Sequence, residues 1–182
     1  MGPNCVGLIN PSHALNASFG LEIGEPGAIA VISQSVALIT AIQDIALSNR
    51  IGFSVLASIG NKACLDEIDF LENLKDDEKT RVIAAYLEDI QNGREFMQIA
   101  EKIAKVKPIA ILKSGRTETG AKAASSHTGS LVGSDAAYNS AFQRSGIIRA
   151  ESIENLFDVL MAFAYQPLPK GNRVGVVTAL VS

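Results

Sequence analysis

Short apolar runs rich in β-branched residues recur along the chain, and segments with helical periodicity separate them. These runs cover residues 28–32, 53–58, 81–87, 108–112, 146–149 and 173–178. The first, third and fourth are apolar at both odd and even positions, which is typical of strands covered on both faces. Apolar residues at three- and four-residue spacing predict helices over 35–47, 65–74, 94–106, 135–145 and 153–165. The alternation predicts an α/β protein with helices on both sides of a parallel sheet.

The extent of the alternating region narrows the fold class further. Residues 27–165 have the size of a doubly wound parallel sheet of the flavodoxin-like type, with strand order 2-1-3-4-5. In such sheets, ligands bind beyond the carboxyl ends of the strands, where the strand order reverses. We therefore expect the functional residues to follow the strands.

The two ends of the chain differ from this central domain. Residues 1–26 are rich in glycine and proline and lack periodicity, which predicts an irregular linker arm outside the sheet. Residues 166–182 begin with a Pro/Gly boundary and continue into a lone apolar run, 173–178. We expect that run to be a strand that begins a following domain.

Composition excludes several classes of function. The chain of 182 residues has a formal charge of −3 and no cluster of Lys and Arg, which argues against nucleic acid as a partner. It has no apolar run near the roughly 20 residues that cross a bilayer, and no signal peptide, so no membrane partner is expected. Cys5 and Cys64 are isolated, without metal-ligand spacing. These features predict a soluble protein of the reducing cytoplasm, without a metal site.

Three polar features fall after predicted strands. Ser33 and Ser35 follow the first strand and open a helix, where amides and hydroxyls suit phosphate, although a serine there is also an ordinary N-cap. Glu88 follows the third strand, where a solvated strand end is the alternative. His127 lies among small hydroxyl residues and glycine in a long connection after the fourth strand; a histidine in a surface loop is the alternative.

These three features should meet, because the first, third and fourth strands are neighbours in the expected order. A carboxylate beside an imidazole fixes one ring nitrogen as the proton carrier and leaves the other free as a nucleophile. Glu88 would then orient His127, and the nearby helix N-terminus would hold phosphoryl oxygens. The combination predicts phosphoryl transfer through a phosphohistidine, with positioning and charge stabilisation as the main catalytic effects.

Several motifs together resemble one family, the nucleoside-diphosphate-forming acyl-CoA synthetases. The motifs, in chain order, are SQS at 33–35, GNK at 60–62, DFL at 69–71, YLE at 86–88, KSGR at 113–116 and SSHTGSL at 125–131. The chain is most similar to the ADP-forming acetate-CoA ligases and more distantly to the succinyl-CoA synthetase α subunit. The resemblance covers nearly the whole chain, and these motifs in combination are highly specific.

The resemblance implies roles for individual residues. His127 carries the phosphoryl group between an acyl phosphate and ADP, and Glu88 orients it. Phosphate-binding positions are Ser33 and Ser35, which begin a helix, together with Ser126, Thr128 and Gly129 beside the histidine. The implied overall reaction is acyl-CoA + ADP + phosphate ⇌ acid + CoA + ATP. No tightly bound cofactor is expected; CoA, ADP or ATP and Mg are substrates of the complete enzyme.

The resemblance also implies partners. Residues 2–7 are similar to the tail of a preceding CoA-binding Rossmann domain, and a nucleotide-binding ATP-grasp domain or subunit completes such enzymes. We therefore expect this polypeptide by itself to be inactive in the full reaction. Selectivity for the acyl group would be built largely by those other parts. The faces that meet companion domains also allow a homodimer.

Two positions depart from the family pattern. Val36 stands where a glycine usually follows the SQS motif, and a β-branched side chain raises the cost of a close approach by phosphate and of any positive φ. The final residues, 178–182, read TALVS where an Asn-Ala-Gly-Gly run is expected.

Two other functions fit parts of the pattern. The chain could be a regulatory or assembly module of the same family, without turnover. Ser35, Glu88 and His127 also occur in the order found in α/β-hydrolases, although the glycines that flank a nucleophile elbow are missing.

Overall fold

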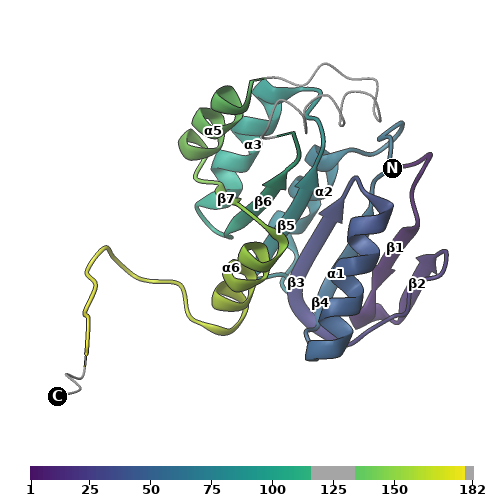
Figure 1. Cartoon of the computed structure of the whole chain (residues 1–182), viewed down its shortest axis with the longest axis horizontal. Coiled ribbons are helices and arrows are strands. Elements are labelled where there is room, and N and C mark those ends of the chain that lie inside the picture. Colours follow the sequence, from purple (N-terminus) through teal and green to yellow (C-terminus); the bar gives the residue numbers. More distant parts are fainter. Residues whose placement is uncertain (116–133, 179–182) are drawn as a thin grey trace.

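The computed structural model describes residues 1–115 and 134–178 of the chain (Figure 1). Over these residues, one sheet contains seven strands in the order β2-β1-β4-β3-β5-β6-β7. The strands are β1 Gly7–Asn10, β2 Leu15–Ser18, β3 Pro26–Ser33, β4 Phe53–Ser58, β5 Val82–Leu87, β6 Ile109–Lys113 and β7 Ile148–Ala150. The five strands from β4 to β7 pair in parallel. Numbered along the chain, these five stand in the order 2-1-3-4-5, which confirms the expected doubly wound, flavodoxin-like class.

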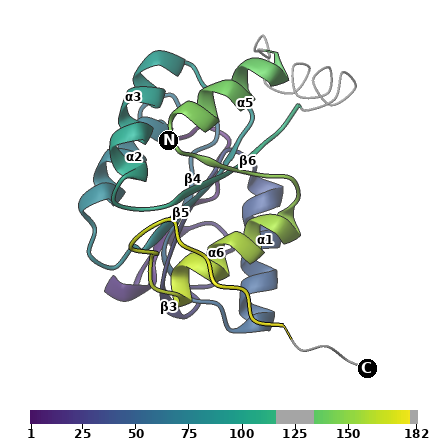
Figure 2. The same ribbon diagram turned by 90° about the vertical axis from the view of Figure 1, so that its left-hand side faces the viewer.

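Helices cover both faces of this sheet. They are η1 Pro11–His13, α1 Val36–Asn49, α2 Glu67–Asp76, α3 Gly93–Ala104, α5 Asp135–Arg144 and α6 Ile153–Tyr165. Helices α1 and α6 pack on one face, and α2, α3 and α5 pack on the other (Figures 1 and 2). Each of these five α-helices begins after a polar N-cap residue whose side chain accepts a backbone N–H. The sequence therefore marks the helix starts locally.

The core explains why the central strands are apolar at both parities. In β3, Val31 packs in the cluster that includes α1 and α6, while its neighbour Ile32 packs in the cluster with α2 and α3. Ala84 and Ala85 of β5 divide in the same way. Because successive side chains of a strand point to opposite faces, the odd and the even positions of a strand are both buried when helices cover both sides of the sheet.

The N-terminal arm is part of the sheet, so the expectation of an irregular arm outside it is wrong. Strands β1 and β2 form an antiparallel hairpin, and β1 also pairs with β4, with Leu8 beside Ala57. Ile9 is completely buried. Each strand is only four residues long, too short for a recognisable alternation, and its pairing depends on the open edge of β4.

The expected strand at 173–178 is also absent from the structure. These residues follow α6 as an extended tail without strand assignment (Figure 1). Val174, Val176 and Val177 are 87%, 84% and 100% exposed. A strand needs a neighbour to pair its backbone groups, and β-branched residues alone do not supply one. Within the described ranges, no helix combines the length and the apolar content that crossing a bilayer requires.

Candidate functional site

Three chain segments meet at the carboxyl ends of the central strands. β3 and β5 pair in register with Ser33 beside Tyr86, and β5 and β6 pair with Leu87 beside Lys113. The residues that follow each strand therefore lie at one edge of the sheet. This is the edge at which a doubly wound sheet binds its ligand.

The serine turn after β3 uses its own hydroxyl groups. Ser33 is fully buried; its Oγ donates to the Ser35 carbonyl oxygen at 2.8 Å and accepts the Ser35 N–H at 3.1 Å. The Ser35 Oγ accepts the Leu38 N–H at 3.2 Å and so caps α1. Both hydroxyls shape the start of the helix. The first turn of α1 presents backbone amides at this edge, where the helix dipole favours an anion.

Gln34, between the two serines, joins the ends of β3 and β5. Its Oε1 accepts the backbone N–H of Glu88 at 2.7 Å and that of Asp89 at 3.2 Å. Its Nε2 donates to the Asp89 carboxylate at 2.6 Å. The backbone N–H of Gln34 in turn donates to the Tyr86 carbonyl oxygen at 3.1 Å. One side chain thus fixes the turn that carries Glu88.

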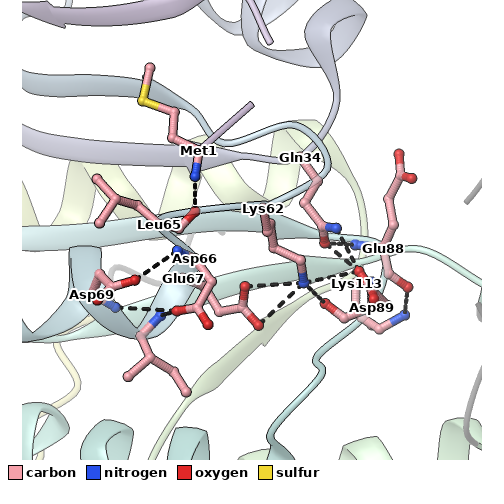
Figure 3. A network of polar contacts seen from close by, with 11 residues as sticks. Met1, Gln34, Lys62, Leu65, Asp66, Glu67, Asp69, Glu88, Asp89 and Lys113 are labelled. Carbon is pink, nitrogen blue, oxygen red and sulfur yellow. Dashed lines mark hydrogen bonds and ion pairs between the residues drawn. The ribbon is translucent and has the colours of Figure 1, made fainter. Parts of the chain in front are cut away.

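Glu88 is held through its backbone. Lys113, at the end of β6, donates from Nζ to the Glu88 carbonyl oxygen at 2.7 Å and to the Ser114 carbonyl oxygen at 2.8 Å. Figure 3 shows the Glu88 side chain directed away from Lys62 and Asp89. Within residues 1–115 and 134–178, the structure gives the Glu88 carboxylate no hydrogen bond.

A buried ion network holds the turn after β5 that carries Glu88 and Asp89 (Figure 3). Lys62 Nζ lies 3.0 Å from the Asp89 carboxylate and 3.1 Å from that of Glu67, and it donates to the Asp89 carbonyl oxygen at 3.1 Å. Burial raises the pKa of Glu67 above its ordinary value, although the Lys62 charge acts against it. Burial also acts to raise the pKa of Asp89, but hydrogen bonds from Gln34 and Lys62 outweigh it and lower that pKa. The network therefore favours an ionised Asp89.

The loop that carries Lys62 is held by the first residues of the chain. The Gly2 N–H donates to the Ile59 carbonyl oxygen at 2.8 Å, and the Asn61 N–H donates to the Pro3 carbonyl oxygen at 3.0 Å. Gly60 has a φ of +57°, and a Cβ atom there would lie 2.3 Å from the Asn4 carbonyl oxygen. Only glycine allows this close backbone approach. The N-terminal segment and the ion network are thus parts of one arrangement.

His127 and its neighbours Ser126, Thr128 and Gly129 lie outside the described residues. The residues on either side of their segment are described, however. The Ser114 N–H donates to the Leu87 carbonyl oxygen at 3.1 Å, directly before Glu88. On the far side, the Tyr138 ring of α5 lies under Lys113, with 4.5 Å between Nζ and the ring centroid. Both approaches to the segment therefore lie at the edge that carries Glu88.

Sequence reasoning missed the polar network behind the site. Gln34, Lys62, Glu67, Asp89 and Lys113 have no predicted role of their own. Lys113 is buried and bonded to backbone carbonyl groups. Gln34 could have been singled out, because it is a polar residue that lies between Ser33 and Ser35 at the end of a strand. Among the described residues, no group of three or more His, Cys, Asp or Glu side chains could hold a metal ion.

A cavity of about 800 Å³ lies at the opposite edge of the sheet. Its lining includes the start of β3 around Gly27 and Ala28, the residues Arg50 and Gly52 before β4, and Tyr165 at the end of α6. Doubly wound sheets bind ligands at the carboxyl ends of their strands, and this cavity lies at the amino ends. We therefore place the candidate site at the Glu88 edge.

Comparison with known proteins gives consistent matches for this domain. The family model described as succinyl-CoA ligase like flavodoxin domain matches residues 26–163. Acetate-CoA ligase [ADP-forming] I of Archaeoglobus fulgidus is 48% identical over 179 residues, covering 98% of this chain and 26% of the relative. The α subunit of acetate-CoA ligase [ADP-forming] I from Pyrococcus furiosus is 47% identical over 178 residues, covering 98% of this chain and 38% of the subunit.

A solved structure agrees with these sequence matches. The dinucleotide forming acetyl-coenzyme A synthetase 1 of Ca. Korarchaeum cryptofilum, in complex with phosphate and ADP, superimposes with a TM-score of 0.90 and 45% identity. The match covers 94% of this chain and 37% of that one. The chain therefore spans well under half of the length of each of these relatives.

Proposed function

Because the chain belongs to the family of succinyl-CoA ligase like flavodoxin domains, we propose that it is the phosphohistidine-carrying domain of an ADP-forming acyl-CoA synthetase. The complete enzyme interconverts acyl-CoA, ADP and phosphate with acid, CoA and ATP. This domain relays the phosphoryl group between an acyl phosphate and ADP. The proposal extends to this chain the acid-thiol ligase activity named for its relatives.

The single observation that supports the proposal most is the setting of Glu88. Its backbone is fixed from two neighbouring strands, by Gln34 and by Lys113, while its carboxylate is directed away from the ion network. The segment containing His127 joins described residues at the same edge of the sheet. This arrangement supports a pair in which the Glu88 carboxylate accepts one ring N–H of His127 and leaves the other nitrogen as the nucleophile.

The chemistry requires two transfers through the same nitrogen. In the first, a nitrogen–phosphorus bond forms on His127 while the bond from phosphorus to the acyl oxygen breaks, and the acid leaves as a carboxylate. In the second, a terminal oxygen of ADP attacks phosphorus, and the histidine leaves. The amides at the start of α1 stabilise the charge on the phosphoryl oxygens. Ser33 and Ser35 shape that helix start, and Ser126, Thr128 and Gly129 contribute from the histidine segment.

The proposed partners follow from the parts of the relatives that lie outside this chain. A CoA-binding Rossmann domain and an ATP-grasp domain or subunit supply the CoA and nucleotide sites, and Mg accompanies the nucleotide. The name of the Pyrococcus furiosus relative, a subunit alpha, supports division of the enzyme between chains. We also propose that the assembly contains two copies of this chain and that it is located in the cytoplasm. The free thiols of Cys5 and Cys64 support a reducing compartment.

The test is phosphorylation of the complete enzyme by ATP labelled at its γ-phosphate. We expect an acid-labile, base-stable label in the wild type, and none after His127→Asn. Turnover should fall about 10³-fold or more, because the nucleophile is removed. His13→Asn is the matched control, since His13 is exposed and its ring Nδ1 lies 3.0 Å from the Asn10 side-chain oxygen.

Three results would contradict the proposal. A label that survives His127→Asn would place the phosphoryl group on another residue. Unchanged turnover of that variant would support an assembly module without a catalytic role. Labelling of Ser35 by a serine-directed phosphonate would support the hydrolase alternative.

A further inference from the structure

We propose that Gln34 is a positioning residue for the phosphoryl relay: it sets the direction of the Glu88 carboxylate, and Asp89 and Lys62 hold Gln34 in place. The inference rests on the proposed function, in which Glu88 orients His127. It assigns a role in the reaction to a residue that has no contact with the Glu88 carboxylate itself.

The contacts of Gln34 determine the orientation of its amide group. Both groups that face Oε1 are backbone N–H donors, from Glu88 and Asp89, and the group that faces Nε2 is the Asp89 carboxylate, an acceptor. A rotation of the amide by 180° would place donor against donor and break all three hydrogen bonds. Gln34 is 8% exposed, so few water molecules can replace the lost partners.

The backbone of Glu88 is consequently fixed from both of its neighbouring strands. Gln34, after β3, accepts its N–H, and Lys113, at the end of β6, donates to its carbonyl oxygen. Fixing the peptide groups on both sides of a residue fixes the direction of its Cα–Cβ bond. The carboxylate is then positioned by a few side-chain torsions only, and small errors in position are costly in catalysis.

The ion network prevents the turn from relaxing without Gln34. Lys62 contacts both the carboxylate and the carbonyl oxygen of Asp89, and Glu67 lies on the other side of Lys62. Lys62 is 7% exposed and Glu67 is 1% exposed. In such poorly solvated surroundings, hydrogen bonds and ion pairs are stronger than in water. The chain of contacts from Glu67 to Gln34 therefore keeps one geometry.

A double-mutant cycle in the complete enzyme tests this role. The rate of phosphoenzyme formation is measured in single turnovers for wild type, Gln34→Met, Glu88→Gln and the double variant. We expect Gln34→Met to lower the rate about 10- to 100-fold, with the KM for nucleotide changed less than about twofold. In the Glu88→Gln background, Gln34→Met should lower the rate less than about threefold further, because the orienting carboxylate is already lost.

Two further variants distinguish a positioning role of Gln34 from a non-specific loss of stability. Gln43→Met is the matched control, because Gln43 is a buried glutamine whose side chain donates to a backbone carbonyl oxygen, that of Glu22, within the same chain. It should leave the rate of phosphoenzyme formation within about twofold of the wild type. Gln34→Glu combined with Asp89→Asn keeps an acceptor for the two N–H groups and a donor between the side chains. It removes the ion pair of Lys62 with Asp89, but the net charge around Lys62 is unchanged because a carboxylate is gained at position 34. This double variant should recover at least about tenfold over Gln34→Glu alone, which places two carboxylates together.

The outcomes distinguish the inference from the proposed function. Equal losses on introducing Gln34→Met into wild type and into Glu88→Gln, or no loss in either, would overturn the role of Gln34 but leave the phosphohistidine intact. A label that persists in His127→Asn would overturn the proposed function itself. If Gln34→Met fails to fold, the rate of phosphoenzyme formation is compared between Gln34→Glu and the double variant Gln34→Glu/Asp89→Asn. A double variant that is no faster than Gln34→Glu would overturn the inference.

Discussion

At the scale of single residues, Lys113 shows how the fold uses a charge away from solvent. Its ammonium group donates to two backbone carbonyl groups and lies over the Tyr138 ring. Burial lowers the pKa of Lys113 to about 8, and the positive charge of Arg149 lowers it too; the carboxylate of Asp89 acts in the opposite direction. The charged form is therefore stabilised less in the folded protein than in water.

This lowered pKa predicts a pH-dependent contribution to stability. Between about pH 8 and the ordinary lysine pKa, the unfolded chain binds more protons at this site than the folded protein, so the free energy of unfolding rises with pH. Between pH 7 and pH 10, wild type should gain about 2 kcal/mol relative to Lys113→Met. Urea unfolding of both proteins at the two pH values measures this difference. Lys105→Met, at an exposed site, is the control. A constant or falling difference would contradict the assignment.

At the scale of elements, the turn from β3 into α1 combines a structural role with the candidate anion site. The Ser33 and Ser35 hydroxyls are bonded within the turn, so the proposed anion site relies on the amino end of the helix rather than on either hydroxyl. Val36 is not among the described residues with positive φ. The departure from the family's glycine therefore causes no left-handed backbone strain, and only the bulk of its side chain bears on the approach of phosphate.

The capping role of Ser35 predicts a measurable loss of stability. Ser35→Ala removes the acceptor for the Leu38 N–H and should lower the free energy of unfolding by about 1 kcal/mol, whereas Ser35→Asp, which retains an acceptor, should lose much less. Ser48→Ala is the control in the same helix, because its exposed hydroxyl donates to the Asp44 carbonyl oxygen and caps no helix start. Urea unfolding monitored by circular dichroism compares the variants. Equal losses for Ser35→Ala and Ser48→Ala would argue against the cap.

At the scale of the whole molecule, the N-terminal hairpin shares the hydrophobic cluster on one face of the parallel sheet. Ile9 of β1 and Leu21 belong to the same buried cluster as Ile39 of α1 and Leu56 of β4. The segment before the hairpin also holds the Gly60 loop through backbone hydrogen bonds. Residues 1–26 therefore contribute to folding as well as leading toward the proposed CoA-binding partner.

This shared core predicts that the hairpin unfolds together with the domain. Ile9→Ala empties a completely buried site and should lower the free energy of unfolding by about 2–4 kcal/mol, in one cooperative transition. Ile23→Ala is the matched control in the same arm; that side chain is 37% exposed, so the loss should stay under about 1 kcal/mol. Denaturant titration followed by two probes measures both variants. A loss below 1 kcal/mol for Ile9→Ala, or a separate early transition, would show that the arm folds independently.

Much of the fold could be predicted because its evidence is local in the chain. Burial on both faces leaves apolar residues at both parities of β3 and β5, and N-caps such as Ser35 mark where helices begin. The same reasoning placed Glu88 at the end of a strand beside that helix. It missed β1 and β2, because four residues are too few to show a period, and it predicted a strand at 173–178 that has no partner to pair with.

The sequence by itself determined the layered α/β architecture and the order of the five parallel strands, because periodicity is a property of neighbouring residues. The His127–Glu88 pair, which comes from motifs, stays a prediction. Only the tertiary structure decided that Gln34 bonds to Asp89, 55 positions away, that Lys62 joins Asp89 to Glu67, and that Lys113 is buried beneath Glu88. Such contacts depend on which strands become neighbours and on how loops approach one another. Their energies depend on exclusion from water, which no single segment of the chain specifies.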